Sequence, residues 1–454
     1  MVILFLKQIY MLSCIRGIYE YYTSPSKKEK HRITINNNSY DISEYNHPGG
    51  SIILDAINND ATNIFYSTHP KYVWDLIEKP SFKRKYQMSS QEGSSQQIFD
   101  DDFYLECKQY LQNYKIQWEQ KYGIYLDTLI ISLWTSSWLI LTIISYLIML
   151  HYHGNIPSSI MLGITWSMCI FNTMHPSMHG GLFNKYTPIK LVLDNTYTIF
   201  SGSAVPRWID NHNFQHHGYT NTTHDPDKYT TPFLRLHPLQ PKKWWYRYQS
   251  IYFPILACIN TLSNQLKHFK YVLNKKGNNK GNMRPIRLYN YYFSLCIWTI
   301  LAYLIPIYKL GFPQCIHTCF IFQMTGSFWA TYNIVINHIF EGVNTYTNNI
   351  GKSFAQRQVL SSCNHSTGSM IATYLTGGLN HQIEHHLFPS LPIHHYPLIS
   401  KDINKICKKH KINYNSKNIV SLLVSVHTTL KLYGTCEPNS GLPDLGDYNH
   451  LMDT

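Results

Sequence analysis

The sequence predicts a mainly α-helical protein, in which a four-helix transmembrane domain with a cytosolic cap of histidine boxes follows a small α+β domain. Three observations predict it: four apolar runs of membrane-spanning length, clusters of histidine among the 24 in the chain, and a His-Pro-Gly-Gly turn near the start. The 454 residues suffice for two domains. We divide the chain into a lead (1–30), the α+β domain (31–90), a linker with an amphipathic helix (91–125), the membrane domain (126–430) and a tail (431–454).

Four apolar runs are near the ~20 residues that cross about 30 Å of hydrocarbon. The runs are 126–150, 156–174, 291–307 and 312–336. Buried core helices are the alternative, but loop charge favours a membrane. The connectors within the two pairs hold almost no Lys or Arg, whereas 185–287 holds many. By the positive-inside rule, that long segment faces the cytosol, on the same side as the α+β domain and the C-terminal segment.

The composition narrows the classes of partner. The 39 Lys and Arg residues outnumber the 26 Asp and Glu residues, and the charge of +13 suits nucleic acid or an anionic membrane surface. The chain has no recognisable nucleic-acid module, so we expect a lipid bilayer and no nucleic acid. The ten cysteines form no CxxC pair, which indicates a reducing compartment rather than a disulfide framework.

The segments that flank the α+β domain have simpler interpretations. The lead is apolar but interrupted by Lys7 and Arg16, which argues against a secretory signal and allows an interfacial anchor. Residues 89–97 are rich in Ser and Gln and predict a polar linker. Residues 100–120 alternate charged and apolar side chains and predict an amphipathic helix that leads to the membrane.

The α+β domain carries a pair of histidines with an informative context. His47 opens the turn His47-Pro48-Gly49-Gly50, and His69 follows after Asp60-Ala61-Thr62. Two imidazoles leave a haem iron six-coordinate, with no site for O₂, so such a haem passes electrons. This segment resembles the cytochrome b5 family, and the resemblance implies haem b held by His47 and His69. The stretch before Asp60 lacks the Gly that the family usually has there.

Three histidine boxes predict metal chemistry. They read HxxxH at His175 and His179, HxxxHH at His212, His216 and His217, and QxxHH at Gln382, His385 and His386. Residues four apart share one face of a helix, so His175 and His179 can face one metal centre. Neighbours such as His216 and His217 diverge by about 100° on a helix and suit two metal ions. Neutral imidazole binds iron, zinc, copper and nickel, and the predicted topology brings all three boxes to one cytosolic rim.

After Asp100 the chain resembles the membrane fatty-acid desaturases. Gln382, within the string GGLNHQIEHHLFP, resembles the front-end subgroup, which also carries an N-terminal cytochrome b5 domain. The resemblance implies two non-haem iron ions. Their implied ligands are His175, His179, His212, His216, His217, His338, Gln382, His385 and His386. For His338 an interfacial histidine is the alternative, and Asn364 is expected as a polar contact around the ligands.

Several residues near the boxes are expected to stay outside the centre. These histidines are His224, His365 and His381. Asp225 and Asp227 are expected to form a turn. Pro176 stands where family members often carry Asp. Beside Trp244 and Trp245, the basic side chains of Lys242, Lys243 and Arg247 either hold a lipid or coenzyme A head or anchor the surface, and we favour the anchor.

The resemblance implies an O₂- and cytochrome b5-dependent front-end desaturase of delta-4, delta-5 or delta-6 type. Such an enzyme places a cis double bond between the carboxyl end and an existing double bond of a polyunsaturated chain, carried by coenzyme A or a phospholipid. The implied setting is the endoplasmic reticulum, with electrons from NAD(P)H through a cytochrome b5 reductase-type flavoprotein. A sphingolipid long-chain-base desaturase, a fused lipid hydroxylase and a non-enzymatic haem-binding membrane protein are the alternatives.

Overall fold

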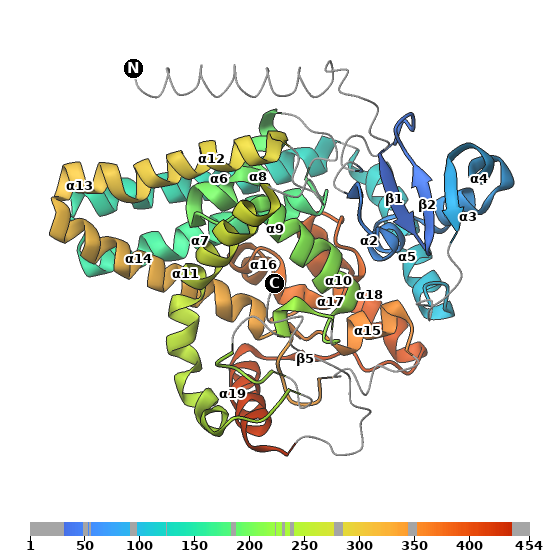
Figure 1. Cartoon of the computed structure of the whole chain (residues 1–454). Helices are drawn as coiled ribbons and strands as arrows, with labels where there is room; N and C mark the ends of the chain where they lie inside the picture. The colour runs from blue at the N-terminus through green and yellow to red at the C-terminus, as the bar shows by residue number, and fades with distance from the viewer. Residues whose placement is uncertain are drawn as a thin grey trace.

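The computed structural model describes residues 31–48, 53, 56–90, 98–123, 125–182, 188–222, 224–228, 232–236, 240–276, 285–343 and 352–437. The expectations for the lead, for Gly49 and Gly50, for most of the linker and for the tail beyond residue 437 lie outside the described residues. The described part is mainly helical, as predicted, with a small sheet in the N-terminal region (Figure 1).

The α+β domain is built on an antiparallel sheet in the order β1-β2-β3. Its elements are β1 (Arg32–Ile35), β2 (Asn38–Asp41), α2 (Thr62–Thr68), α3 (Lys71–Glu78), α4 (Pro80–Tyr86) and β3 (Gln87–Ser90). Asn36 and Asn37 join β1 to β2 with φ of 46° and 60°, the left-handed pair that suits a two-residue hairpin. Ile33, Ile35 and Tyr40 are buried, as alternation along half-buried strands requires.

The membrane domain contains helices at all four predicted apolar runs. They are α6 (Tyr125–His151), α7 (Ile156–Met178), α12 (Pro285–Thr299) with η5 (Ile300–Leu304) and α13 (Ile305–Leu310), and α14 (Phe312–Val335). Figure 1 shows them as a bundle on the side away from the sheet. Among the described residues, two stretches are long and apolar enough to cross a membrane, Tyr125–His151 and Tyr289–Leu310. The count of four spanning helices therefore stays a prediction.

The helices α7 and α14 touch backbone to backbone. A Cβ on Gly163 would lie 2.4 Å from the carbonyl oxygen of Phe322, and one on Gly326 would lie 2.9 Å from the carbonyl oxygen of Gly163. Small residues permit such close contact between membrane helices. Next to this contact, Trp166 stacks on Phe322 with ring centroids 5.0 Å apart. The packing fixes two helices that lead into the histidine-bearing cap.

The cap is assembled from two stretches of chain. The first provides α8 (Pro188–Ser201), α9 (Val205–Trp208), η2 (Ile209–His216), α10 (His217–Tyr219), η3 (Pro226–Lys228), η4 (Trp244–Tyr248) and α11 (Gln249–Lys276). The second provides α15 (Phe354–Leu360), β4 (Asn364–His365), α16 (Met370–Thr376), η7 (Leu379–His381), α17 (Gln382–Leu387), η8 (Ile393–His395), α18 (Tyr396–Lys409), β5 (Ser416–Lys417) and α19 (Ile419–Thr435).

A helix with buried contacts joins the α+β domain to the cap. This is α5 (Asp102–Tyr122), which matches the expected amphipathic helix within two residues at each end. The buried ammonium of Lys108 donates to the carbonyl oxygen of Ser67 at 2.5 Å, and the hydroxyl of Tyr104 donates to that of Tyr66 at 3.3 Å. One apolar core runs from the sheet through α5 to α17 and α18, so the small domain is packed on the cap.

Candidate metal centre

One group of histidines combines all three boxes. Ring nitrogens of His175, His179, His212 and His385 all lie within 4.8 Å of one another. The Nε2 atoms of His175 and His212 are 3.2 Å apart, and that of His217 lies 3.2 Å from that of His212. His175 is near the end of α7 and His385 is on α17, so residues distant in sequence converge here.

A second group forms beside the first. It contains His216, His338 and His386, whose ring nitrogens also lie within 4.8 Å of one another. The Nε2 atoms of His338 and His386 are 3.2 Å apart, and the side-chain amide of Gln382 lies 2.9 Å from Nε2 of His338. Each residue expected as an iron ligand from the sequence thus lies in or beside one of the two groups.

A π-helix sorts the second box between the two groups. The sequence predicted an ordinary helical spacing, but the structure places His212 and His216 in η2, which is wider than an α-helix. Its hydrogen bonds join residues five apart, which brings His212 next to His217. His216 and His217 still diverge, with ring planes at 84°, so the neighbours face different groups. Single turns of π-helix are frequent at functional sites.

Asp225 orients one of these histidines, a role that the sequence analysis missed. We expected Asp225 to form a turn, and it does accept the backbone N–H of Asn221 and of Asp227 at 2.8 and 3.0 Å. Its carboxylate also lies 3.1 Å from Nδ1 of His216, and both residues are buried. This contact fixes the proton on Nδ1 and leaves Nε2 free to bind a metal. Asp225 raises the pKa of His216 against the opposing effect of burial.

Two other rings have similar partners. Nδ1 of His338 lies 2.9 Å from the carbonyl oxygen of Ser361, and Nδ1 of His386 lies 2.7 Å from Oε1 of Gln358. Both oxygens only accept, so each Nδ1 carries the proton and each Nε2 keeps its lone pair. Gln358 is far from every box in the sequence, and no motif pointed to it.

The geometry fits two metal ions. Burial lowers the pKa of His338 to about 3, so the ring is neutral and its lone pair is available. Imidazole nitrogens about 2.1 Å from a shared metal lie roughly 3 Å apart, close to the 3.2 Å separations observed here. Among the described residues, Nε2 of His179, Nε2 of His385 and Oε1 of Gln382 are buried without a hydrogen-bond partner. A metal would satisfy such atoms.

Comparison with known proteins matches this arrangement to a family. The family model described as "Fatty acid desaturase" matches residues 150–418, and the one described as "Cytochrome b5-like Heme/Steroid binding domain" matches residues 20–116. The chain belongs to the fatty acid desaturase family. Members of this family are membrane-bound oxidoreductases that act on acyl lipids and use iron held by histidine clusters, and the two histidine groups fit a di-iron site.

Individual relatives resemble the desaturase over most of its length. It is 25% identical to "Delta(5) fatty acid desaturase A" of Dictyostelium discoideum, over 85% of this chain and 86% of the relative. It is also 25% identical to "Acyl-lipid (8-3)-desaturase" of Physcomitrium patens, over 83% of this chain and 82% of the relative. The "sn-1 linoleoyl-lipid 6-desaturase" of Synechocystis is 27% identical, over 64% of this chain and 83% of the relative.

The remaining predicted residues lie around the centre. The amide nitrogen of Asn364 donates to the buried carboxylate of Glu384 at 2.7 Å, and its oxygen accepts the backbone N–H of Ile383 at 2.9 Å. Asn364 therefore holds α17, which carries the third box. His381 accepts the backbone N–H of Gly368 at 3.0 Å. His224, His365 and His381 lie in neither histidine group.

The two expected haem ligands face each other in the α+β domain. Nε2 of His47 lies 3.5 Å from Nε2 of His69, close to the roughly 4 Å that an iron between two imidazoles needs. Nδ1 of His69 lies 3.0 Å from the carbonyl oxygen of Phe65, which directs Nε2 toward His47. Burial lowers the pKa of His69 to about 4, so the ring is neutral. The pair fits a bis-histidine haem.

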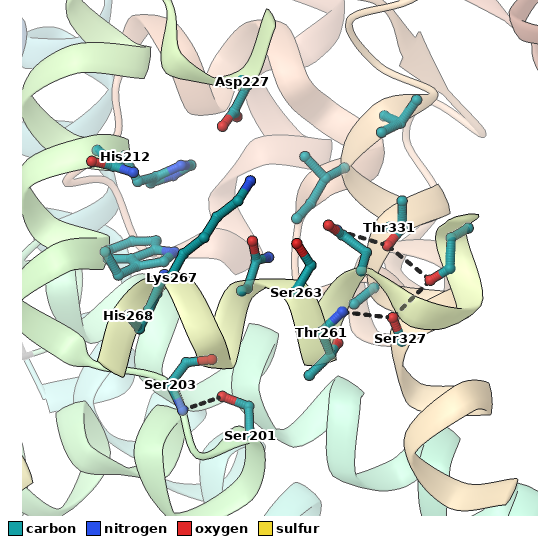
Figure 2. Close-up of a pocket in the computed structure, with 18 of the residues that line it drawn as sticks. Ser201, Ser203, His212, Asp227, Thr261, Ser263, Lys267, His268, Ser327 and Thr331 are labelled. Carbon is teal, nitrogen blue, oxygen red and sulfur yellow. Dashed lines mark hydrogen bonds between the residues drawn. The ribbon is translucent and has the colours of Figure 1, made fainter. Parts of the chain in front are cut away.

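A cavity of about 1380 Å³ adjoins the histidines. This volume exceeds the roughly 300–1,000 Å³ of common small-molecule sites. His175, His212 and Gln382 line it, and so do Trp166 and Phe322 from α7 and α14. Figure 2 shows polar side chains of α11 at the cavity, with Lys267 extending toward Asp227. The cavity thus joins a metal centre to both apolar and polar walls.

Proposed function

We propose that this desaturase is a front-end fatty-acyl desaturase. It places a cis double bond between the carboxyl end and an existing double bond of a polyunsaturated acyl chain. The printed names of its relatives include Delta(5), (8-3) and 6-desaturases, and they do not fix the position for this chain. The observation that carries the proposal is the pair of histidine groups opening onto a long, partly apolar cavity.

The reaction explains why the chain assembles this site. An unactivated methylene has no acidic proton, so acid and base side chains cannot dehydrogenate it. A bound pair of iron ions supplies O₂-dependent oxidation. The two histidine groups would hold these ions, and the contacts of Asp225, Ser361 and Gln358 orient three of the rings. Trp166 and Phe322 line the cavity and would help to position an acyl chain beside the centre.

The α+β domain would supply the electrons. His47 and His69 would hold haem b, whose two axial rings leave no site for O₂. An external NAD(P)H-dependent flavoprotein of the cytochrome b5 reductase type would reduce it. The helix α2, which leads to His69, contacts α10 and η2 of the second box. This contact supports transfer within one chain from the haem side to the metal centre.

The setting proposed from the sequence is the endoplasmic reticulum, with the haem domain and the histidine boxes on the cytosolic side. The sequence places most Lys and Arg in the segment between the two apolar pairs, as the positive-inside rule requires of a cytosolic segment. The packing of the α+β domain on the cap supports a shared side for both, because the two form one core.

Expression in yeast with double-bond mapping tests the proposed function. Cells that express the desaturase are fed separate polyunsaturated acids, and their lipids are analysed by mass spectrometry. We expect a new double bond on the carboxyl side of an existing one, and we expect none with His217→Ala. His224→Ala, which alters a histidine outside both groups, is the matched control for expression and haem content. A hydroxylated product, or unchanged lipids despite haem loading, would contradict the proposal.

A further inference from the structure

The helix α11 (Gln249–Lys276) has two opposite faces of different chemistry. One face carries apolar side chains that are 39–76% exposed. These residues, which we call the α11 stripe, are Ile251, Ile255, Ile259, Leu262, Leu266, Phe269 and Leu273. Their spacing of three or four residues places them within one sector of the helix. The other face lines the cavity with Asn260, Ser263 and Lys267, so α11 separates the cavity from its surroundings.

The α11 stripe belongs to a wider apolar surface. α11 packs against α19, whose Val420 and Val424 are 67% and 61% exposed. Next to both lies η4, where Trp244 is 70% exposed beside Lys243 and Arg247. Exposed apolar residues bordered by aromatic and basic side chains are typical of a surface that lies in the headgroup region of a membrane. In Figure 1, α11 crosses the bundle where it meets the cap, rather than running along it.

The cavity reaches the surface beside this stripe. Ile259 of the stripe and Phe233 both line the cavity, and both are exposed, at 39% and 55%. Lys270 also lines the cavity and is exposed. An acyl chain that entered here from a bilayer would pass from hydrocarbon into the cavity without exposure to water, which removes the main cost of moving apolar surface.

The charges that line the cavity are nearly balanced. Four are basic (Arg207, Lys228, Lys267, Lys270) and three are acidic (Asp210, Asp225, Asp227). Mixed charges suit a zwitterionic headgroup, whose phosphate and ammonium both need partners. Coenzyme A carries several phosphates and no cation at its phosphate end, so the acidic side chains would repel it.

We propose that the substrate is the acyl chain of a zwitterionic phospholipid, which enters from the bilayer through the opening beside the α11 stripe. This proposal rests on the proposed function and specifies its acyl carrier. The surface formed by α11, α19 and η4 lies in the headgroup region of the cytosolic leaflet. Lipid therefore reaches the cavity by lateral movement, without a soluble carrier.

A reconstituted assay distinguishes the carriers. The full-length holoenzyme in nanodiscs, with reductase and NADH but no acyltransferase, receives one labelled polyunsaturated acyl chain either in phosphatidylcholine or as a coenzyme A thioester. We expect desaturation of the phosphatidylcholine at least about tenfold faster. Equal rates, or faster reaction of the thioester, would overturn the proposal while leaving the desaturase function intact. No product from either carrier would instead overturn the proposed function, and the carrier with it.

A crosslinking experiment tests the entrance without relying on activity. Nanodiscs contain phosphatidylcholine with a diazirine in its acyl chain, and labelled peptides are identified by mass spectrometry. We expect labelling of α11 comparable to that of α6, and a several-fold loss at α11 alone in the Leu262→Glu, Leu266→Glu double variant. Tyr72→Glu changes a side chain that is 68% exposed in the α+β domain and should alter neither signal. Labelling of α6 without α11 in the unaltered protein would contradict the entrance.

Discussion

At the scale of single residues, the boxes could be predicted because each is a short local pattern. His175 and His179, four apart, indicate a shared face before any fold is known. The orienting groups could not be predicted in this way. Asp225 looked like part of a turn, and Gln358 reaches His386 only through the folded cap. Contacts between distant segments leave no local signal in one sequence.

Asp225 provides a test at this scale. Asp225→Asn keeps a side-chain oxygen for the backbone N–H groups of Asn221 and Asp227 but removes the charge that faces His216. We expect retention of non-haem iron against a chelator to fall by about 10–100-fold, as for other partners of metal-bound histidine. Asp402→Asn, at a half-exposed site on α18, is the matched control. Iron retention equal to that of the unaltered protein would show that Asp225 only shapes the loop.

At the scale of elements, long periodic runs were more predictable than local geometry. Helices occur at every apolar run, and α5 begins and ends within two residues of expectation. The π-helix at His212–His216 was not predicted, because its sequence also fits an α-helical spacing. The amphipathic character of α11 also went unnoticed, since its polar face lines a cavity that only the fold creates.

The contact between α7 and α14 provides a test at the scale of elements. Gly163→Val would place side-chain atoms against the carbonyl oxygen of Phe322, where a Cβ already lies at 2.4 Å. We expect a loss of about 1–3 kcal/mol in stability, as for other overpacked sites. Thermal unfolding in detergent would show a lower midpoint. Ile160→Val, at a partly exposed position on the same helix, is the control and should unfold near the original midpoint.

At the scale of the whole molecule, the haem domain is part of the cap. The sequence predicted a Ser- and Gln-rich linker, which suggests two separate units, but the described residues on either side of it share one core. Gly218 follows the second box, and a Cβ there would lie 2.5 Å from Nδ2 of Asn63 on α2. The stacked rings of Tyr66 and Phe99, 4.2 Å apart, strengthen the same junction.

Gly218 allows the junction to be tested. Gly218→Leu would push α2 away from the second box without altering a histidine. We expect the reduced haem to be reoxidised several-fold more slowly when O₂ and substrate are added, because the distance for electron transfer increases. Stopped-flow absorption measures this rate, while the haem spectrum and iron content report intact sites. Asn63→Ala combined with Gly218→Ala should restore most of the rate. Unchanged reoxidation in Gly218→Leu would contradict a route through this contact.

The central claim is that the two histidine groups each hold a non-haem iron ion beside the cavity. The most direct measurement is the ratio of non-haem iron to haem in the purified full-length protein, determined by metal analysis together with haem absorption. The expected ratio is two non-haem irons per haem, falling toward one in His338→Ala while the haem signal is unchanged. Iron in an amount equal to haem alone, in protein that is folded and haem-loaded, would contradict the account.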